Sequence, residues 1–516
     1  MNYRKITSTA MAVVLIGLAF TLALFLTQSL ASLSFPFEID YGEGIVWQQA
    51  LLFFSPKAYG SIDKIPFIVF HYTPLYHLFV LGMAKATGWD MLFAGRCVSI
   101  FATLMIATVI GILINEAMPA DASKKHRVLA SALIGLTIFS ILPIFDWSQL
   151  MRVDMLAELL TLIGFWLGLK SYRRPGLIYL AAFFFVAAVY AKQNMVAAPI
   201  ALFGLMLWIR PKLGASGIAT SVVIGLLVLG MMSYLTSGQF INHILYYNIN
   251  TFDWGRLRHL FPTMISHVNL LAATFVVLIF GIVKFGRIFL KNRIPEVRSV
   301  IGSNQGLLAL LSTLIYFMIA TPMLILFAKE GANLNYTIEW FVASVLLIGI
   351  SIFGSASEFE GVNKNIHSSS SILKIKSLTI LLLIALHVIS IGRYLPEHRL
   401  FDDHAGKMVQ LENLCNRVRS SPKPVISDEL VMLLRCGKSV QWESAIFAQL
   451  EKNGMWNPSS FITEIRAQNF GMFITVGERG NPLFDSRYSP AVADAIDTAY
   501  PLKQRIAGFI VHLPRP

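Results

Sequence analysis

The sequence has little charge and almost no cysteine. Asp, Glu, Lys and Arg make up only 14% of its 516 residues, whereas hydrophobic residues make up 55%. That is more apolar surface than one soluble core needs, which excludes an ordinary soluble globular protein. The three cysteines have no zinc-binding spacing. Cys97 lies in an apolar segment, so Cys415 and Cys436 could form one disulfide at most, provided that they lie outside the cell.

Acidic residues are also scarce, since 29 Asp and Glu face 42 Lys and Arg, for a net charge of +13. Such an excess can indicate a nucleic-acid partner. Here, most of the basic residues before the C-terminal region lie in short loops between apolar segments, where orientation relative to a bilayer is the usual cause. We therefore expect a membrane lipid environment and no nucleic-acid partner.

Apolar segments of roughly 17 to 25 residues recur from residue 7 to residue 391, as membrane-spanning helices require. The charged start followed by an apolar run to residue 30 resembles a signal peptide. That run is too long for one, so we expect an uncleaved first helix. The expected spans, about eleven in number, are 8–30, 93–115, 128–145, 154–170, 176–190, 194–210, 214–236, 267–288, 303–328, 338–354 and 373–392.

The segment 66–88 is apolar but interrupted by His71, Tyr72, Pro74, His77 and Lys85, so it either crosses the membrane or lies at its interface. If it does not cross, eighteen Lys and Arg lie on one side and nine on the other before the C-terminal region. This asymmetry is typical of a cytoplasmic side. We therefore predict a non-crossing segment, a cytoplasmic N-terminus and an outward C-terminus.

Carboxylates gather in the predicted outer segments, 31–65, 146–153, 191–193, 237–266 and 329–337, and at the helix starts beside them. Asp40 and Glu43 follow the first span, and Asp154 and Glu158 lie four apart at the start of another. An ionised side chain in a membrane costs about 2.5 to 3.5 kcal/mol, so such residues usually face a wet cavity. A solvated loop, or a simple Arg152–Asp154 ion pair at a helix end, explains them about equally well.

Two further outer segments contain cations and amides. They are Lys192-Gln193-Asn194 and the stretch from Lys329 to Tyr336 that includes Asn335. Each segment alone could be a turn, and a lone lysine is more often solvated. Together with the carboxylates, however, they match the needs of glycosyl transfer from a lipid phosphate. A carboxylate accepts the proton of the attacking hydroxyl, and cations hold the leaving phosphate.

Four short motifs resemble type C glycosyltransferases, of the bacterial branch related to protein O-mannosyltransferases and lipid A aminoarabinose transferases. They are Asp40-Tyr41-Gly42-Glu43-Gly44, His71-Tyr72-Thr73-Pro74-Leu75-Tyr76, Gly95-Arg96 and Arg152-x-Asp154. The resemblance implies an all-α polytopic bundle with juxtamembrane helices in the first outer loop and a polyprenyl-phosphate sugar donor.

The resemblance also implies roles for residues. Asp40 would be the general base, with Glu43 as the alternative. The choice between them stays open, because Tyr41 follows Asp40 where the family often has an adjacent Asp-Glu pair. The residues expected to line the donor or acceptor cavity are His71, Tyr72, Arg152, Asp154, Lys192, Lys329, Asn335 and Tyr336.

Residues 393–516 differ from the spanning region 1–392, because their apolar runs are short. Strands are expected at 425–427, 472–476 and 509–511, and helices near 402–419, 441–452, 459–468 and 489–498. Since helices separate these strands, we predict a small α/β domain with a parallel sheet. No catalytic motif is recognised in it.

The sequence thus predicts a multi-pass glycosyltransferase of the bacterial cytoplasmic membrane, a hexosyl- or pentosyltransferase. It would move a sugar from a polyprenyl phosphate to a lipid, glycan or protein acceptor at the outer face. A transporter or flippase is the alternative, although the charges cluster at one face and no second half repeats the first. A third hypothesis is an assembly protein whose outer loops bind a partner. No cofactor is required, but Asp40, Glu43 and Asp154 could hold a divalent cation.

Overall fold

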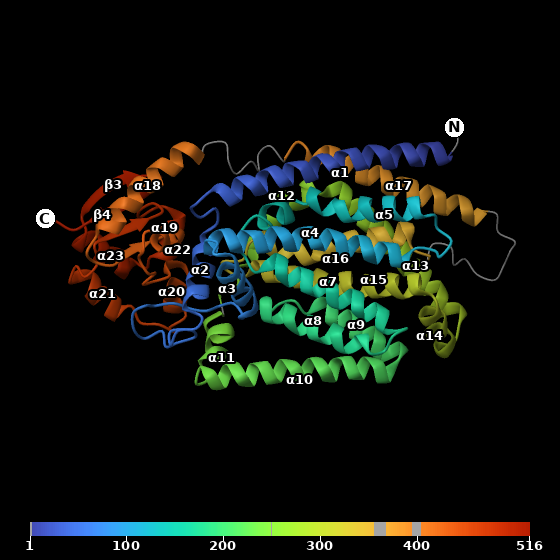
Figure 1. The fold of residues 1–516 in the computed structure, drawn as a ribbon, viewed down its shortest axis with the longest axis horizontal. Coiled ribbons are helices and arrows are strands. Elements are labelled where there is room, and N and C mark those ends of the chain that lie inside the picture. Colours follow the sequence, from blue (N-terminus) through green and yellow to red (C-terminus); the bar gives the residue numbers. More distant parts are fainter. Residues whose placement is uncertain (1–2, 249, 356–367, 395–403, 516) are drawn as a thin grey trace.

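The computed structural model describes residues 3–248, 250–355, 368–394 and 404–515. Long helices lie side by side in a bundle, and a smaller C-terminal domain covers one end of it (Figure 1). The bundle helices are α1 (Tyr3–Ser34), α4 (Met91–Ala117), α5 (Lys124–Leu136), α7 (Asp154–Ser171), α8 (Leu177–Ala191), α9 (Ala197–Ile209), α10 (Pro211–Leu235), α13 (Val268–Lys291), α15 (Gln305–Met323), α16 (Ile338–Phe353) and α17 (Ser368–Ile391).

Each predicted span overlaps one of these helices. In the described residues, six helical segments are long and apolar enough to cross a membrane: Thr9–Ser34, Met91–Ala117, Pro211–Leu235, Val268–Lys291, Gln305–Ala328 and Leu334–Phe353. Three shorter apolar helices, Leu177–Ala191, Ala197–Ile209 and Lys376–Ile391, lie among them. The chain is therefore a multi-pass membrane protein, and the count of about eleven spans remains a prediction.

One predicted span, 128–145, is not a single helix. It divides into α5, a 3-10 turn η1 (Thr137–Ser140) and α6 (Leu142–Trp147). Pro143 stands in the first turn of α6, where its missing N–H is tolerated, whereas inside a continuous helix it would break a hydrogen bond.

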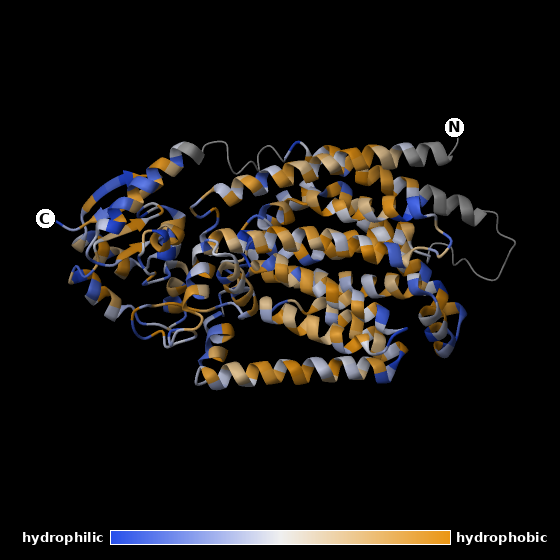
Figure 2. Cartoon of the chain, in the orientation of Figure 1, coloured by the Kyte–Doolittle hydropathy of each residue, from blue (hydrophilic) through white to orange (hydrophobic). Residues whose placement is uncertain are grey.

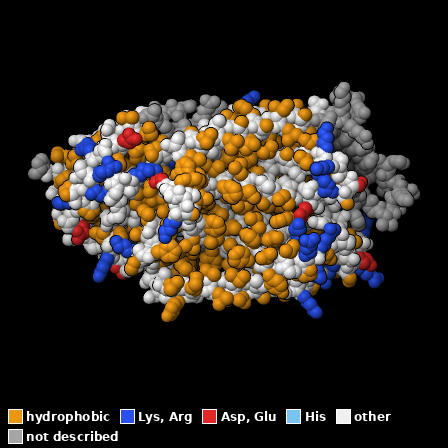
Figure 3. Space-filling view, in the orientation of Figure 1, with side chains coloured by type: hydrophobic (Ala, Val, Ile, Leu, Met, Phe, Trp, Pro, Cys, Tyr) orange, Lys and Arg blue, Asp and Glu red, His pale blue; other side chains and the backbone are white. Residues whose placement is uncertain are grey.

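Hydrophobic residues predominate in the bundle helices (Figure 2), and hydrophobic side chains cover most of the bundle face seen in Figure 3. The helix α10 is the clearest case, because Val223, Leu226, Leu227 and Leu235 on it are more than half exposed. Lipid tails solvate such a surface, whereas water would not. Lys and Arg side chains gather at the end of the bundle farther from the C-terminal domain (Figure 3). Further Lys and Arg side chains lie on the C-terminal domain in the same view, and the orientation of the chain stays a prediction.

The segment 66–88 does not form one long helix. Its helical part is α3 (Leu75–Thr87), and α2 (Tyr41–Leu52) precedes it in the same loop. Both lie at the bundle end nearest the C-terminal domain (Figure 1). Thirteen residues rise about 20 Å, too little for the hydrocarbon core of roughly 30 Å. This supports the non-crossing interpretation of 66–88.

Further short elements connect the spans. They are α11 (Gln239–Ile244), η2 (Tyr246–Asn248), η3 (Trp254–His259), α12 (Leu260–Ser266), α14 (Ile294–Ser303), η4 (Leu324–Ala328) and η5 (Leu334–Thr337).

The C-terminal domain contains a four-stranded sheet in the order β1-β2-β4-β3. Its strands are β1 (Val425–Ser427), β2 (Met472–Thr475), β3 (Leu502–Ile506) and β4 (Phe509–Leu513), and its helices are α18 (His404–Ser420), α19 (Leu430–Arg435), α20 (Ser444–Lys452), α21 (Ser459–Arg466), α22 (Pro482–Arg487) and α23 (Pro490–Ala499). The predicted boundary near 393 lies just before residues 395–403, outside the described residues.

The prediction of a parallel sheet is wrong for two of the three strand pairings. The strands β1 and β2 pair in parallel, but β4 pairs antiparallel with both β2 and β3. The strand β3 was missed because it is an edge strand whose polar residues are mostly exposed. A two-residue turn, Ala507-Gly508, joins it to β4, and both turn residues have positive φ, as a type I′ hairpin requires.

The first outer loop is built into this domain. Phe67 forms a parallel bridge with Trp442, and its ring lies 5.3 Å from that of Trp456 and 5.8 Å from that of Phe461. The Glu38 carboxylate accepts a hydrogen bond from the backbone N–H of Leu430 at the start of α19 (3.0 Å). The domain therefore holds the loop that contains Asp40.

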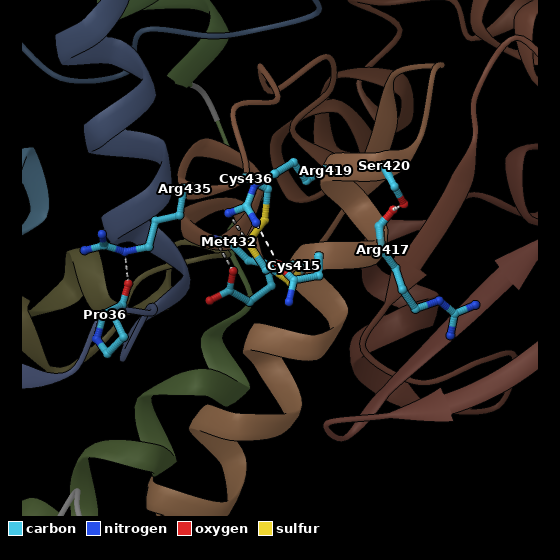
Figure 4. Close-up of a disulfide and its surroundings, with 10 residues drawn as sticks. Pro36, Cys415, Arg417, Arg419, Ser420, Met432, Arg435 and Cys436 are labelled. Carbon is cyan, nitrogen blue, oxygen red and sulfur yellow. Dashed lines mark hydrogen bonds between the residues drawn. A yellow bond between two sulfur atoms is a disulfide. The ribbon is translucent and has the colours of Figure 1, made fainter.

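A disulfide joins Cys415 of α18 to Cys436, the residue that ends α19, with a Cα–Cα distance of 5.6 Å (Figure 4). The preceding residue, Arg435, points to the first outer loop, where Nε donates to the Pro36 carbonyl. It also pairs with Asp90 at 2.9 Å. The disulfide therefore secures the helix that contacts the loop.

Candidate active site

The candidate residues lie at the bundle end that the C-terminal domain covers. Asp40 directly precedes α2 and caps it, since Oδ1 accepts from the Gly42 N–H (3.0 Å). The same oxygen accepts from Arg152 Nη1 at 2.8 Å. A Cβ atom at Gly42 would lie 1.2 Å from that nitrogen, so only glycine at this position lets Arg152 reach Asp40.

Arg152 connects Asp40 to Tyr72. Its Nη2 atom donates to the Tyr72 hydroxyl at 3.0 Å, and its guanidinium lies 5.8 Å from the Tyr72 ring centroid. The side chains of Asp40 and Arg152 are 27% and 14% exposed. Among the described residues, none donates a hydrogen bond to Asp40 Oδ2. This carboxylate is thus held in place and still accessible.

Glu43 has a different environment, although it lies only three residues farther on. It is fully buried and forms two hydrogen bonds with Arg96, at 2.8 Å to Nε and 2.7 Å to Nη2. The backbone N–H groups of Ile39 and Met151 each donate to it at 2.8 Å. Burial raises the pKa of Glu43, but the Arg96 guanidinium and the two N–H groups lower it by more, so its pKa lies below the usual value.

Arg96 also donates to the carbonyls of Ser32, Phe35 and Phe37 at the end of α1. The pair Glu43–Arg96 therefore joins α1, α2, α4 and the segment before α7 into one unit. This arrangement stabilises the helices around Asp40. It also leaves Glu43 without access to a ligand. From the sequence, Arg96 was named only in the Gly95-Arg96 motif and was given no role. A charged residue inside an apolar helix is costly unless it is paired, and this could have identified it.

A second polar group centres on Asp154, the first residue of α7. Its Oδ1 atom accepts from Lys192 Nζ at 2.7 Å and from Asn335 Nδ2 at 2.8 Å. The ammonium of Lys192 lies 5.0 Å from the ring centroid of Tyr336. All four predicted residues therefore meet, from three segments that are far apart in the sequence.

These residues line a small cavity of about 20 Å³, together with Glu158 and Glu339, which is enough for water. Within the described residues, Asp154 Oδ2 is buried without a hydrogen-bond partner, whereas Glu158 and Glu339 both interact with the Tyr316 hydroxyl. Glu158 and Glu339 were not chosen as site residues from the sequence. Both are acidic residues within an apolar segment, and that signal would have found them.

His71 and Lys329 lie beside these two groups. The His71 carbonyl accepts from Gln193 (2.8 Å) and Asn248 (3.1 Å), while Lys329 Nζ donates to Asn248. Burial and, to a smaller extent, the charges of Arg152 and Lys329 lower the pKa of His71 to about 3. Burial also lowers the pKa of Lys329. The imidazole is therefore neutral at physiological pH.

Arg152 is central to the arrangement, because it interacts electrostatically with both Asp40 and Asp154. The site thus combines one accessible carboxylate with the cations Arg152, Lys192 and Lys329. The described residues contain no group of three His, Cys, Asp or Glu side chains placed to hold a metal. Asp40, Glu43 and Asp154 each face their own Arg or Lys instead.

Two solved structures share this fold across nearly the whole chain. ArnT from Cupriavidus metallidurans in the apo state has a TM-score of 0.58 at 11% identity, covering 96% of this chain and 97% of that one. ArnT bound to undecaprenyl phosphate has a TM-score of 0.56 at 12% identity, with the same coverage. No family model matches the chain, and no curated protein matches it.

At such low identity the likeness concerns the fold. The fold is that of ArnT, a type C membrane glycosyltransferase, as the motifs predicted.

Proposed function

We propose that this chain, with its ArnT-like fold, is a glycosyltransferase that uses a polyprenyl-phosphate sugar donor. The acceptor is a lipid, a glycan or a protein, and the reaction takes place at the outer face of the bacterial cytoplasmic membrane. The observation that carries the proposal is the accessible Asp40 carboxylate, held by Arg152 within a cationic site at one end of a membrane bundle.

The proposed reaction needs one base and a place for the phosphate. The acceptor hydroxyl attacks the anomeric carbon of the sugar, its proton passes to Asp40, and the bond from that carbon to the phosphate oxygen breaks. The polyprenyl phosphate leaves with the bonding electrons, and Arg152, Lys192 and Lys329 stabilise its negative charge. Tyr72, Asn335, Tyr336 and neutral His71 contribute hydrogen bonds and shape to the cavity.

Asp40 is preferred to Glu43 as the base for a geometric reason. Asp40 has an oxygen without a donor and is 27% exposed, whereas Glu43 is 0% exposed and bonded to four N–H donors. A base must be within hydrogen-bond reach of the acceptor hydroxyl, and Glu43 is not accessible to it.

The proposed orientation rests on two observations. Lys and Arg gather at the bundle end away from the C-terminal domain (Figure 3), as cytoplasmic ends usually do. The C-terminal domain contains a disulfide, and structural disulfides persist in oxidising compartments such as the periplasm. Both observations support a site on the outer face.

The test is transfer of labelled sugar from a polyprenyl phosphate to a membrane extract by the purified protein. We expect Asp40→Asn to lower turnover by about 10² to 10⁴-fold with polyprenyl-phosphate binding retained. The matched control is Asp63→Asn, which changes an exposed aspartate of the same loop and should leave turnover unchanged.

Full activity of Asp40→Asn would overturn the assignment of the base. If the wild type transfers no sugar from any donor tested but moves a labelled lipid-linked sugar across proteoliposomes, the chain is a flippase instead.

A further inference from the structure

A groove opens on the outside of the bundle between α4 and α5, at the end farther from the C-terminal domain. It has a volume of about 510 Å³ and is lined mainly by small or apolar residues, among them Thr108, Gly111, Val128 and Ala132. It belongs neither to the candidate active site nor to the C-terminal domain.

Small residues create this groove by drawing the two helices together beneath it. A Cβ atom at Gly135 would lie 2.5 Å from the Ala107 carbonyl oxygen, and one at Gly111 would lie 3.3 Å from that of Ser131. Thr108 and Val128 are exposed beside this close approach. The floor is therefore backbone and short side chains, which leaves the space above it open to the surrounding lipid.

Two cations, Lys124 and Arg127, lie at the head of the groove. The Arg127 guanidinium donates to the carbonyls of Asn115, Pro119 and Ala122, so it is positioned but not neutralised. Lys124 is exposed. Across the part of the chain that the structure describes, neither residue has an ion-pair partner. The nearby Glu116 is already paired with Lys170 at 2.9 Å.

We propose that this groove binds one anionic phospholipid, with an acyl chain along α4 and α5 and its phosphate beside Lys124 and Arg127. An apolar groove within the hydrocarbon region is filled by lipid rather than by water. Basic pockets between spanning helices at the membrane surface bind anionic headgroups. A zwitterionic lipid offers the same phosphate but adds an ammonium, which the two cations repel. This site is independent of the proposed glycosyl transfer.

The experiment measures lipid binding to the purified full-length protein in detergent by native mass spectrometry, with phosphatidylglycerol and phosphatidylcholine compared at equal concentration. We expect the wild type to retain phosphatidylglycerol preferentially. Lys124→Gln should weaken that binding by about fivefold, the factor for one basic residue at a membrane surface. Thr108→Trp should weaken it by filling the groove.

The matched control is Lys212→Gln, which removes another exposed lysine, at the start of α10 and away from the groove; it should leave binding unchanged. Arg127 is left intact because it supports the loop between the helices. Equal retention of both lipids by the wild type would overturn the proposal. So would unchanged binding in Lys124→Gln, or an equal loss in Lys212→Gln, which would indicate attraction to the basic end as a whole.

Discussion

At the scale of single residues, two carboxylates three positions apart have opposite environments. Asp40 lies at the accessible end of a helix, whereas Glu43 is enclosed by Arg96 and two backbone N–H groups. A carboxylate with every acceptor site filled stabilises the structure and has no capacity left for a substrate proton. Substitution of Asp40 should therefore lower turnover, whereas substitution of Glu43 should lower stability.

We expect Glu43→Gln to lower the free energy of unfolding by about 3 to 5 kcal/mol, because it leaves the buried Arg96 charge uncompensated. Thermal unfolding in detergent measures this loss. The matched control is Glu116→Gln, which breaks a partly exposed pair with Lys170 and should cost no more than about 1 kcal/mol. Equal effects of the two substitutions would contradict the structural role of Glu43.

At the scale of elements, α19 connects the C-terminal domain to the loop that contains Asp40. Its first N–H groups bind Glu38, its Arg435 contacts Pro36, and the disulfide follows it directly. The position of Asp40, two residues after Glu38, therefore depends on a helix that belongs to another part of the chain.

The paired substitution Cys415→Ser with Cys436→Ser should lower the free energy of unfolding by about 3 kcal/mol, since the bridge closes a loop with a sequence separation of 21. Thermal unfolding with and without reductant measures the effect. Cys97→Ser, which changes the free cysteine, serves as the control. If reductant lowers the melting temperature of the paired variant as much as that of the wild type, the disulfide is not the cause.

At the scale of the whole molecule, two buried acidic residues, Glu443 and Glu429, lie where the domain meets the bundle. Glu443 is fully buried, and its Oε2 atom accepts from the Val69 N–H of the first outer loop at 3.4 Å. Burial raises the pKa of Glu443 to about 8, and burial raises that of Glu429 to about 7. The folded state therefore favours the protonated forms of both.

The folded state binds these protons more tightly than the unfolded state, in which a glutamate has a pKa of about 4.5. The stability that the two residues contribute should therefore be complete below pH 4.5 and be lost as the pH rises through about 7 to 8. Melting temperatures between pH 5.5 and 8.5 test the direction. Glu443→Gln should reduce the decrease, while Asp63→Asn, at an exposed carboxylate, should not. A melting temperature that rises over this range in the wild type would refute the assignment.

The orientation of the whole molecule is tested by labelling intact cells with a membrane-impermeant maleimide, in a Cys97→Ser background that keeps the disulfide. Ser460 in the C-terminal domain and Ser299 on α14 are both exposed. We expect Ser460→Cys to be labelled and Ser299→Cys to be protected until the cells are opened. The reverse pattern would place the candidate site in the cytoplasm.

The sequence by itself determined the class of the protein, because long apolar segments can be satisfied only in lipid and need no tertiary information. It also predicted that Asp40, Arg152, Asp154 and Lys192 lie at one end of the bundle, since ionised side chains are costly beside lipid, but it did not select Glu158 and Glu339. The bounds of most helices follow from the same local signal. The strand β3 could not be predicted in this way, because an exposed edge strand lacks alternating apolar residues.

The different exposure of Asp40 and Glu43 could be seen only in the tertiary structure, because it depends on Arg96 and Arg152, which are more than 50 residues away along the chain. The tertiary structure alone showed that Phe67 inserts into the C-terminal domain and that β4 reverses the sheet. Burial, pairing and register all arise from contacts between distant segments, and no local pattern of residues contains them.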